Sequence, residues 1–372
     1  MGGSLHLIEK AMRDDLDQLV AATAAAQRFS GAVHVTLDRS TALAVAFGEA
    51  DRLARIRNTV DTRFGIASGT KFATALAAGA LIDDGVLALD DRLINVVSTP
   101  LPGVSPGVTI GHLLTHTSGV YDYLDEDVIG DADHFELPIA PSELLGPRDY
   151  LPMLVAGPAK FEPGARFSYS NSGFVLLGLA LEEVSGCSFH TLIEERVLRP
   201  CGMADSGFFR FDRLPTRVAK GYVETENGGW RTNGNSLPII GGPDGGMFAT
   251  VGDMDRLWRG FFAGAAISPK LASMFMKKAA TQVEKEHSYY GHGVWIRDDG
   301  VGPPLHYIVG SDAGVSFRSS AHSDVTFATV ASNTSRGAWP MIKAIDDWIR
   351  ANPALISAPK SDQVKNRGHR IL

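Results

Sequence analysis

The sequence predicts an α+β fold, in which an antiparallel β-sheet flanked by helices is built from both chain ends and a mostly helical lobe is inserted between them. Three observations predict it: β-rich segments near the N-terminus, a helical middle, and a return of β-rich segments after about residue 215. The 372 residues, 44% of them hydrophobic, are enough for a large core and for two lobes. We expect residues 1–66 and 215–372 to form one lobe and residues 67–214 the helical lobe, with a candidate site between them.

The first segments predict a helix followed by a hairpin. Apolar residues recur at helical spacing from Leu5 to Val20, so an amphipathic helix is expected over residues 5–27. Two β-rich runs, 31–37 and 41–48, are separated by a turn-like Asp-Arg-Ser sequence. This arrangement predicts a β-hairpin.

The rest of the chain is expected to pass through helices and long loops before the strands return. The helical part contains an apolar helix within residues 64–86 that ends at an Asp-Asp-Gly sequence, the segment 108–120, a polar loop at 121–141 and a helix at 174–186. The later β-rich runs are 245–250, 289–296, 305–310, 315–320 and 325–333. An amphipathic helix at 339–351 closes the fold, and the tail beyond Pro359 is expected to be loose.

Composition excludes several classes of partner. The net charge is −7 and no Lys/Arg run is longer than a pair, which disfavours nucleic acid binding. No run of about 18 apolar residues is present, so no membrane span is predicted. The N-terminus lacks the apolar stretch of a signal peptide, and Cys187 and Cys201 lack metal-ligand spacing. We therefore expect a cytoplasmic protein with idle thiols, no cofactor and a small-molecule partner; the oligomeric state stays open.

Ser68 and Lys71 form the first candidate constellation. Residues three apart share one face of a helix, so the Ser68 hydroxyl and the Lys71 amine can meet. A serine becomes a nucleophile when a base takes its proton, and burial in this apolar helix would lower the pKa of Lys71 and leave it neutral. The alternative is that Ser68 caps the helix and Lys71 reaches solvent.

Tyr169 and Asn171 lie in a polar turn before the helix at 174–186. A tyrosine beside a lysine can exchange protons with a reacting group, and the asparagine can orient both the lysine and a substrate carbonyl. The alternative is simple capping of the helix.

A third segment, residues 306–320, places Gly310 and Gly314 around Ser311 on an expected strand. Glycine in a strand often marks close approach of a ligand or of another backbone. If this strand lines the site, the backbone N–H groups of Ser311 and Ser68 would form an oxyanion hole. The alternative is a β-bulge at a sheet edge.

In order and spacing, these three motifs resemble the serine β-lactamase and penicillin-binding-protein superfamily, and in particular its class C branch. That branch includes carboxylesterases, D-amino-acid peptidases and transesterases. Lesser motifs extend the resemblance over residues 30–350: GVLALDDRL (85–93), VTIGHLLTHTSGV (108–120) and GGMFATVGDMDRL (245–257). The resemblance implies a β-lactamase/transpeptidase-like fold and a hydrolase that forms an acyl-enzyme on Ser68.

The third motif departs from the family pattern. The family usually places Lys, His or Trp two residues before the glycine, whereas this chain has Ile308-Val309-Gly310. His306, two residues earlier on the same face, is a possible substitute. Without a cation, a substrate carboxylate would lose its partner, so we expect a carboxylesterase for small uncharged esters. The alternatives are an amide hydrolase (β-lactamase or D-amino-acid peptidase) and a catalytically silent binding protein.

Three other patterns are interpreted as structural. The G-x-S-x-G sequence at 103–107 lacks a strand-turn-helix context and is expected to be a loop. His112 and His116 have i, i+4 spacing but no evident third ligand, so no metal site is expected. The acidic residues of the polar loop are interpreted as a solvated rim, with a border of the site entrance as the alternative; they are Asp122, Asp125, Glu126 and Asp127.

Overall fold

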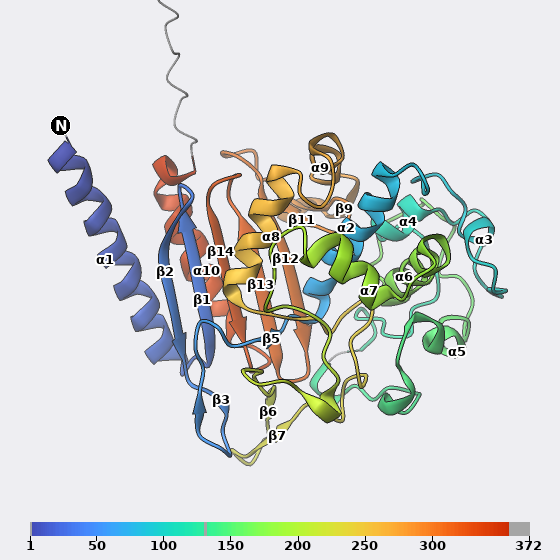
Figure 1. Ribbon diagram of the computed structural model, residues 1–372, viewed down its shortest axis with the longest axis horizontal. Helices are drawn as coiled ribbons and strands as arrows, with labels where there is room; N and C mark the ends of the chain where they lie inside the picture. Colours follow the sequence, from blue (N-terminus) through green and yellow to red (C-terminus); the bar gives the residue numbers. More distant parts are fainter. Residues whose placement is uncertain (1, 130–131, 357–372) are drawn as a thin grey trace, which may run out of the picture.

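The computed structural model describes residues 2–129 and 132–356 and confirms the α+β prediction. Its main feature is an eight-stranded antiparallel sheet in the order β2-β1-β14-β13-β12-β11-β10-β9 (Figure 1). The strands are β1 (Gly31–Leu37), β2 (Ser40–Phe47), β9 (Ala280–Val283), β10 (Ser288–Tyr290), β11 (Trp295–Arg297), β12 (Leu305–Asp312), β13 (Val315–Ala321) and β14 (Phe327–Ser332). Because β1 pairs with β14, both chain ends build one sheet.

Alternate residues of the strands face two different helical layers, as the period of two requires. On one face, Val33 and Val35 share a core with α1 (Gly2–Gln27) and α10 (Ala338–Ala351). The opposite face packs against α8 (Val251–Ala263), whose Trp258 is fully buried and lies beside Phe327. Figure 1 shows α8 on the near side of the sheet.

The helical part is centred on α2 (Thr70–Asp83), which packs against α6 (Asn171–Ser185). Every residue of α2 from Thr70 to Leu81 is buried, as expected of a helix that is apolar on all sides. The shorter helices around this pair are α3 (Leu93–Val96), α4 (Ile110–Leu114), α5 (Leu151–Leu154), α7 (Phe189–Ile193) and α9 (Pro269–Phe275). The division of the chain into two lobes at the expected residues stays a prediction.

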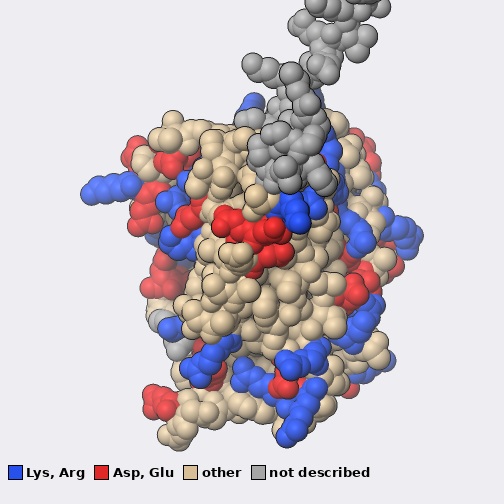
Figure 2. Space-filling model, turned by 90° about the vertical axis from the view of Figure 1, so that its left-hand side faces the viewer, with Lys and Arg blue, Asp and Glu red and all other residues tan. Residues whose placement is uncertain are grey.

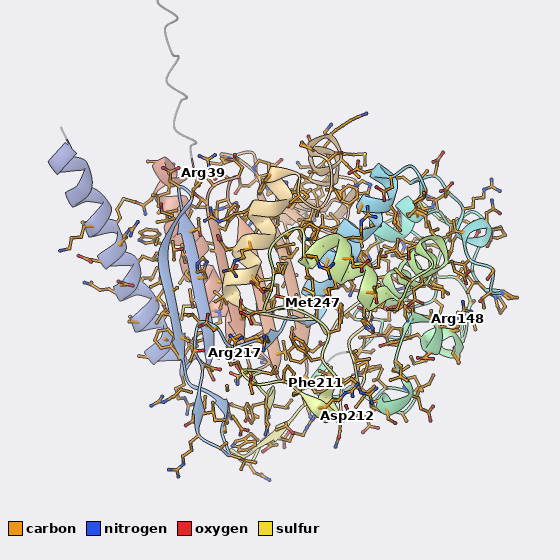
Figure 3. The ribbon with its side chains drawn as sticks, in the orientation of Figure 1. Arg39, Arg148, Phe211, Asp212, Arg217 and Met247 are labelled. Carbon is orange, nitrogen blue, oxygen red and sulfur yellow. The ribbon has the colours of Figure 1, made fainter. Side chains whose placement is uncertain are left out.

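The described residues also form two-stranded sheets outside the large sheet. They are β3 (Glu49–Asp51) with β4 (Ile56–Arg57), β5 (Phe64–Gly65) with β8 (Phe248–Ala249), and β6 (Tyr222–Glu224) with β7 (Trp230–Thr232). Met247, which precedes β8, is fully buried and accepts a hydrogen bond from the Ile66 N–H at 2.9 Å (Figure 3). Two distant segments thus hold the chain just before Ser68.

Two strand predictions need correction. The run 289–296 is a hairpin, β10 and β11, because the chain turns through Gly293, whose φ of 80° favours glycine. The run 245–250 contributes only β8, which pairs with β5 outside the large sheet. The tail beyond Pro359 lies outside the described residues.

Within residues 2–129 and 132–356, no single helix is long and apolar enough to cross a membrane, although α6 and the segment Phe189–Leu198 pass this test together as a bent pair. Figure 2 shows the side of the molecule that lies on the left of Figure 1. On this face acidic and basic side chains are interspersed around an area of other residues. This face therefore lacks the continuous basic surface that nucleic acid binding requires.

Candidate active site

Ser68 lies in a short 3₁₀ turn, Ala67–Gly69, that leads directly into α2. Gly69 is the N-cap of α2, and no side chain makes a capping hydrogen bond there. Lys71 is 2% exposed, so it does not reach solvent. The alternative of a capping serine and a solvent-exposed lysine is therefore wrong.

The Lys71 amine is held by three oxygen atoms. Its Nζ lies 2.9 Å from Ser68 Oγ, 2.7 Å from Asn171 Oδ1 and 2.5 Å from the backbone oxygen of Asp244. Asn171 is itself fixed, because its Nδ2 donates to the Leu124 oxygen at 2.8 Å. The structure thus brings together Ser68, Lys71 and Asn171, as the sequence predicts, and adds Asp244.

Burial lowers the pKa of Lys71, because the interior disfavours the ammonium form. Four carboxylates oppose this effect electrostatically without contacting the amine directly, the strongest being Asp244, followed by Glu126, Asp122 and Asp312. The three hydrogen-bonding oxygens belong to neutral groups.

Tyr169 lies beside the same amine, with its ring centroid 4.9 Å from Lys71 Nζ. Burial raises the pKa of Tyr169 well above its ordinary value, while a hydrogen bond with Ser68 acts in the opposite direction. The phenol is therefore protonated at neutral pH. The helix cap next to it is Ser170, whose side chain accepts from the Gly173 N–H at 2.9 Å, so capping does not explain Tyr169 or Asn171.

His116 supports Tyr169, a contact that the sequence analysis missed. Its Nδ1 accepts a hydrogen bond from the Ser170 N–H at 3.0 Å, and its ring centroid is 4.4 Å from that of Tyr169. Trp295 stacks on Tyr169 from β11, with ring centroids 5.9 Å apart. Burial holds the pKa of His116 well below its ordinary value, so the ring is neutral. The sequence signal that could have indicated this contact is His116 itself, which directly precedes the Thr-Ser-Gly sequence at 117–119.

Gly310 brings β12 against the turn that carries Ser68. A Cβ atom at this position would lie 2.1 Å from the Ile66 oxygen and 2.8 Å from the Ser68 nitrogen. Only glycine permits this approach. The β12–β13 register runs without a shift from His306 to Asp312, so the β-bulge alternative is wrong. β11 pairs with β12 only as far as Tyr307, so the residues of β12 that follow are not paired with β11.

Among residues 2–129 and 132–356, no cation takes the place of the one missing from the third motif. His306 Nε2 lies 3.0 Å from the Met276 oxygen and does not line the cavity beside Ser68. Arg318 packs over the Tyr307 ring and pairs with Asp346. Ile308 is 2% exposed and belongs to the hydrophobic core.

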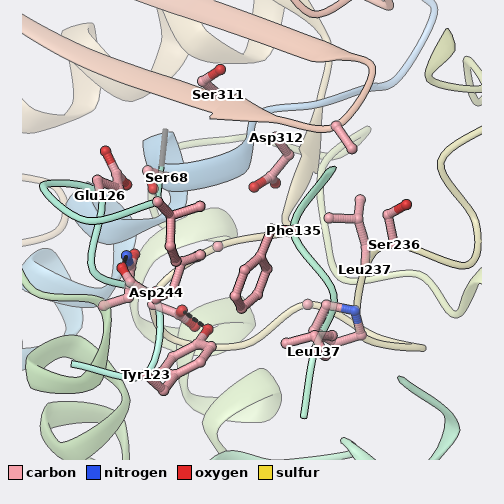
Figure 4. A pocket seen from close by; sticks show the side chains of 18 of the residues that line it. Ser68, Tyr123, Glu126, Phe135, Leu137, Ser236, Leu237, Asp244, Ser311 and Asp312 are labelled. Atoms are coloured by element: carbon pink, nitrogen blue, oxygen red, sulfur yellow. Dashed lines mark hydrogen bonds between the residues drawn. The ribbon is translucent and has the colours of Figure 1, made fainter. Parts of the chain in front are cut away.

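A cavity of about 240 Å³ opens beside Ser68 (Figure 4). Much of its lining is apolar and includes Leu124, Ile129, Phe135, Leu137, Tyr150, Phe211, Leu237 and Pro238. The polar lining includes Asn171 and Ser311 together with three carboxylates, Glu126, Asp244 and Asp312. No Lys, Arg or His belongs to the described lining.

The acidic loop contributes to the site rather than forming a solvated rim. Asp122 is 5% exposed and accepts from the backbone N–H groups of Asn171 and Ser172 at 3.0 and 2.9 Å. Asp125 pairs with Lys160 at 2.7 Å, and Glu126 lines the cavity. The solvated-rim interpretation is therefore wrong for Asp122, and the alternative of a border to the site holds for this loop.

The remaining candidates have structural contacts. Ser105 lies in a loop, as expected. His112 Nδ1 accepts from the Thr109 N–H at 3.2 Å in a capping box. Cys187 and Cys201 are free, and burial raises the pKa of Cys201 to about 11, which keeps it a thiol.

Comparisons with known proteins identify the family of the chain. The Beta-lactamase family model matches residues 16–344. Protein Rv1367c of Mycobacterium tuberculosis (strain H37Rv) is 30% identical over 295 residues, which cover 72% of each chain. Esterase EstB of Burkholderia gladioli is 35% identical over 192 residues, 48% of this chain and 46% of EstB. The crystal structure of a penicillin-binding protein from Bacillus halodurans matches with a TM-score of 0.83 and 37% identity, covering 88% of this chain and 99% of that one. The chain belongs to the Beta-lactamase family and is a serine hydrolase.

Proposed function

We propose that the protein is a carboxylesterase that forms an acyl-enzyme on Ser68 and acts on small esters without a carboxylate, uncharged esters being the simplest. The observation that carries the hydrolase chemistry is the 2.9 Å contact between Lys71 Nζ and Ser68 Oγ at a buried amine. A lysine activates a serine only in its neutral form.

The hydrogen bonds around Lys71 can be satisfied by a neutral amine as well as by an ammonium, whose three N–H groups would donate to the same three oxygens; burial, which lowers the pKa of Lys71, favours the neutral form. A neutral amine has two N–H groups and one lone pair. Asn171 Oδ1 and the Asp244 backbone oxygen accept the two N–H groups, which leaves the lone pair for the Ser68 hydroxyl. Lys71 is thus the general base that receives the Ser68 proton when Oγ attacks the ester carbon.

Tyr169 then serves as the acid. Its protonated phenol donates to the leaving alkoxide and regains a proton from Lys71, so the alcohol departs neutral. In the second half-reaction, deacylation, a water molecule attacks the acyl carbon and gives a proton to the Lys71–Tyr169 pair. The pair returns a proton to Ser68 Oγ as the acid product leaves. The backbone N–H groups of Ser68 and Ser311 hold the oxyanion, as the close approach of β12 at Gly310 supports.

The cavity lining favours esters without a carboxylate. β-Lactams and peptide C-termini carry a carboxylate, and no described cation of this cavity can pair with it. Glu126, Asp244 and Asp312 would also repel it. An amide hydrolase for substrates without a carboxylate is the second candidate. A silent binding protein is disfavoured, because a buried lysine beside a serine is costly to keep without a function.

Two measurements test the proposal. A fluorophosphonate probe is expected to label Ser68 in the folded protein, and absence of an adduct would sink the enzyme mechanism. The substrate class is tested by kcat/KM for p-nitrophenyl butyrate, a chromogenic cephalosporin and an amino-acid amide, assayed side by side. The ester is expected to give the highest value. A higher value for the cephalosporin would show that the esterase assignment is wrong.

A further inference from the structure

Asp312 is the residue of the cavity that the proposed chemistry leaves unexplained. It lies on β12, and its carboxylate points into the cavity toward Ser68 and Phe135 (Figure 4). Among the described residues this carboxylate has no hydrogen-bond or ion-pair partner, unlike that of Asp244, whose Oδ2 accepts from the Tyr123 hydroxyl at 2.6 Å. An unpaired carboxylate inside a cavity is costly, so its retention points to a ligand that pairs with it.

The surroundings of Asp312 increase this cost. Burial raises its pKa to about 7, and Asp244 and Glu126 act in the same direction, while Lys71 opposes them. The arginines labelled in Figure 3 do not line this cavity and pair elsewhere: Arg39 with Asp324, Arg148 with Glu183 and Arg217 with Asp205. The described lining of the cavity therefore holds three acidic side chains and no basic one.

Strand geometry places this charge near the reacting carbonyl. Residues two apart on a strand share a face, so Asp312 lies on the same side as Gly310, about 6 to 7 Å further along. Gly310 in turn approaches the Ser68 nitrogen. A cation a few bonds from the scissile carbonyl would reach the Asp312 carboxylate, while the rest of the substrate contacts the apolar residues of the cavity lining.

We propose that Asp312 is a specificity-determining residue that binds a protonated amine of the substrate close to the scissile carbonyl. The preferred substrates are then small esters or amides that carry an ammonium group, beyond the uncharged esters of the proposed function. This inference rests on that function, because it uses the same nucleophile and cavity. Glu126 and Asp244 add electrostatic attraction without needing direct contact.

The test uses pairs of esters that differ only in charge. Methyl 3-aminopropanoate and methyl butanoate place an ammonium or a methyl group at the same position of the acyl part. 2-(Dimethylamino)ethyl butanoate and 3-methylbutyl butanoate place a protonated amine or a CH group at the same position of the alcohol part. In at least one pair, wild-type kcat/KM is expected to be roughly 10- to 100-fold higher for the charged ester, the range of a charged hydrogen bond.

Variants connect this preference to Asp312. Asp312→Asn keeps the size of the side chain and is expected to reduce the charged-to-neutral ratio to within about threefold. Asp312→Glu is expected to retain part of the ratio. Asp347→Asn is the matched control: it removes the same charge from the exposed side of α10, where Asp347 pairs with Lys343, and should leave the ratio at its wild-type value.

The outcomes separate this inference from the proposed function. Hydrolysis of the neutral esters that depends on Ser68, with no preference for charge in either pair, would overturn the role of Asp312 and leave the esterase proposal standing. A preference that survives Asp312→Asn would also overturn it. If Ser68 forms no adduct and no ester is hydrolysed, the proposed function itself is wrong. Thermal unfolding of each variant shows whether it folds.

Discussion

The amine of Lys71 lies 2.9 Å from the hydroxyl of Ser68, on a side chain that is 2% exposed and forms no ion pair among the described residues. Carboxylates surround the amine, yet each atom that it contacts belongs to a neutral group. Such a site favours a neutral amine that accepts a proton from the serine. The predictions below follow from this arrangement.

Ser68→Ala is expected to lower kcat for p-nitrophenyl butyrate by at least about 1,000-fold, since the nucleophile is lost. The melting temperature should change little, because Ser68 makes no capping hydrogen bond. Ser105→Ala, in the loop at 103–107, is the matched control and should keep wild-type activity. Equal losses in both variants would identify Ser68 as the wrong nucleophile.

Lys71→Met and Tyr169→Phe are expected to lower kcat by roughly 100-fold or more each, because each removes one group of a shared proton path. The double variant should lose far less than the product of the two factors. Single-turnover rates of acylation measure the effect. Factors that multiply would contradict a shared path.

The pH profile of kcat/KM should rise as Lys71 loses its proton. Burial lowers the pKa of Lys71 from its ordinary value of 10.5, so the plateau is reached at a lower pH than an exposed lysine would give. The pKa of Tyr169 is raised, so no fall is expected near pH 10, the ordinary value for tyrosine.

Asp312→Asn provides the control for this profile. The Asp312 carboxylate raises the pKa of Lys71, so its removal should move the rising limb to lower pH. Burial raises the pKa of Asp312 to about 7, so this carboxyl could also produce a rising limb in the profile. If the rising limb disappears in Asp312→Asn, it reports the titration of Asp312 and not that of Lys71.

Gly310→Ala is expected to reduce kcat/KM by about 100-fold and to destabilise the fold by roughly 1 to 3 kcal/mol, as overpacking does. The added Cβ would meet the Ile66 oxygen at 2.1 Å and push β12 away from the Ser68 turn. Gly146→Ala is the control, since nothing lies within 4 Å of its Cβ position and its φ of −160° suits alanine. Chemical denaturation and ester hydrolysis measure both effects.

Ile308→Lys should raise the ratio of kcat/KM for a carboxylate-bearing cephalosporin over p-nitrophenyl butyrate by about tenfold. Ile308 lies on the same face of β12 as Gly310, whereas Val309 faces the other way. Val309→Lys is thus the control and should leave the ratio unchanged. An equal gain from both lysines would show that the family motif aligns differently on this strand.

The local sequence was enough to predict the parts of the site that lie within one segment. Ser68 and Lys71 meet because residues three apart share a helix face, and burial of Lys71 follows from the apolar residues around it. The β-rich runs near both ends predicted one sheet from the two chain ends, which the pairing of β1 with β14 confirms. The family followed from the order of the motifs.

Contacts between distant segments were decided only by the tertiary structure. The sequence does not show that Asp244 supplies a backbone oxygen to Lys71, 173 residues earlier, or that His116 supports Tyr169. It also does not show that the Asp312 side chain points into the cavity. Nor does it show that the His306 ring is hydrogen-bonded to the Met276 oxygen. Periodicity determines which residues share a face of one element, but which elements pack against that face depends on burial of the whole core.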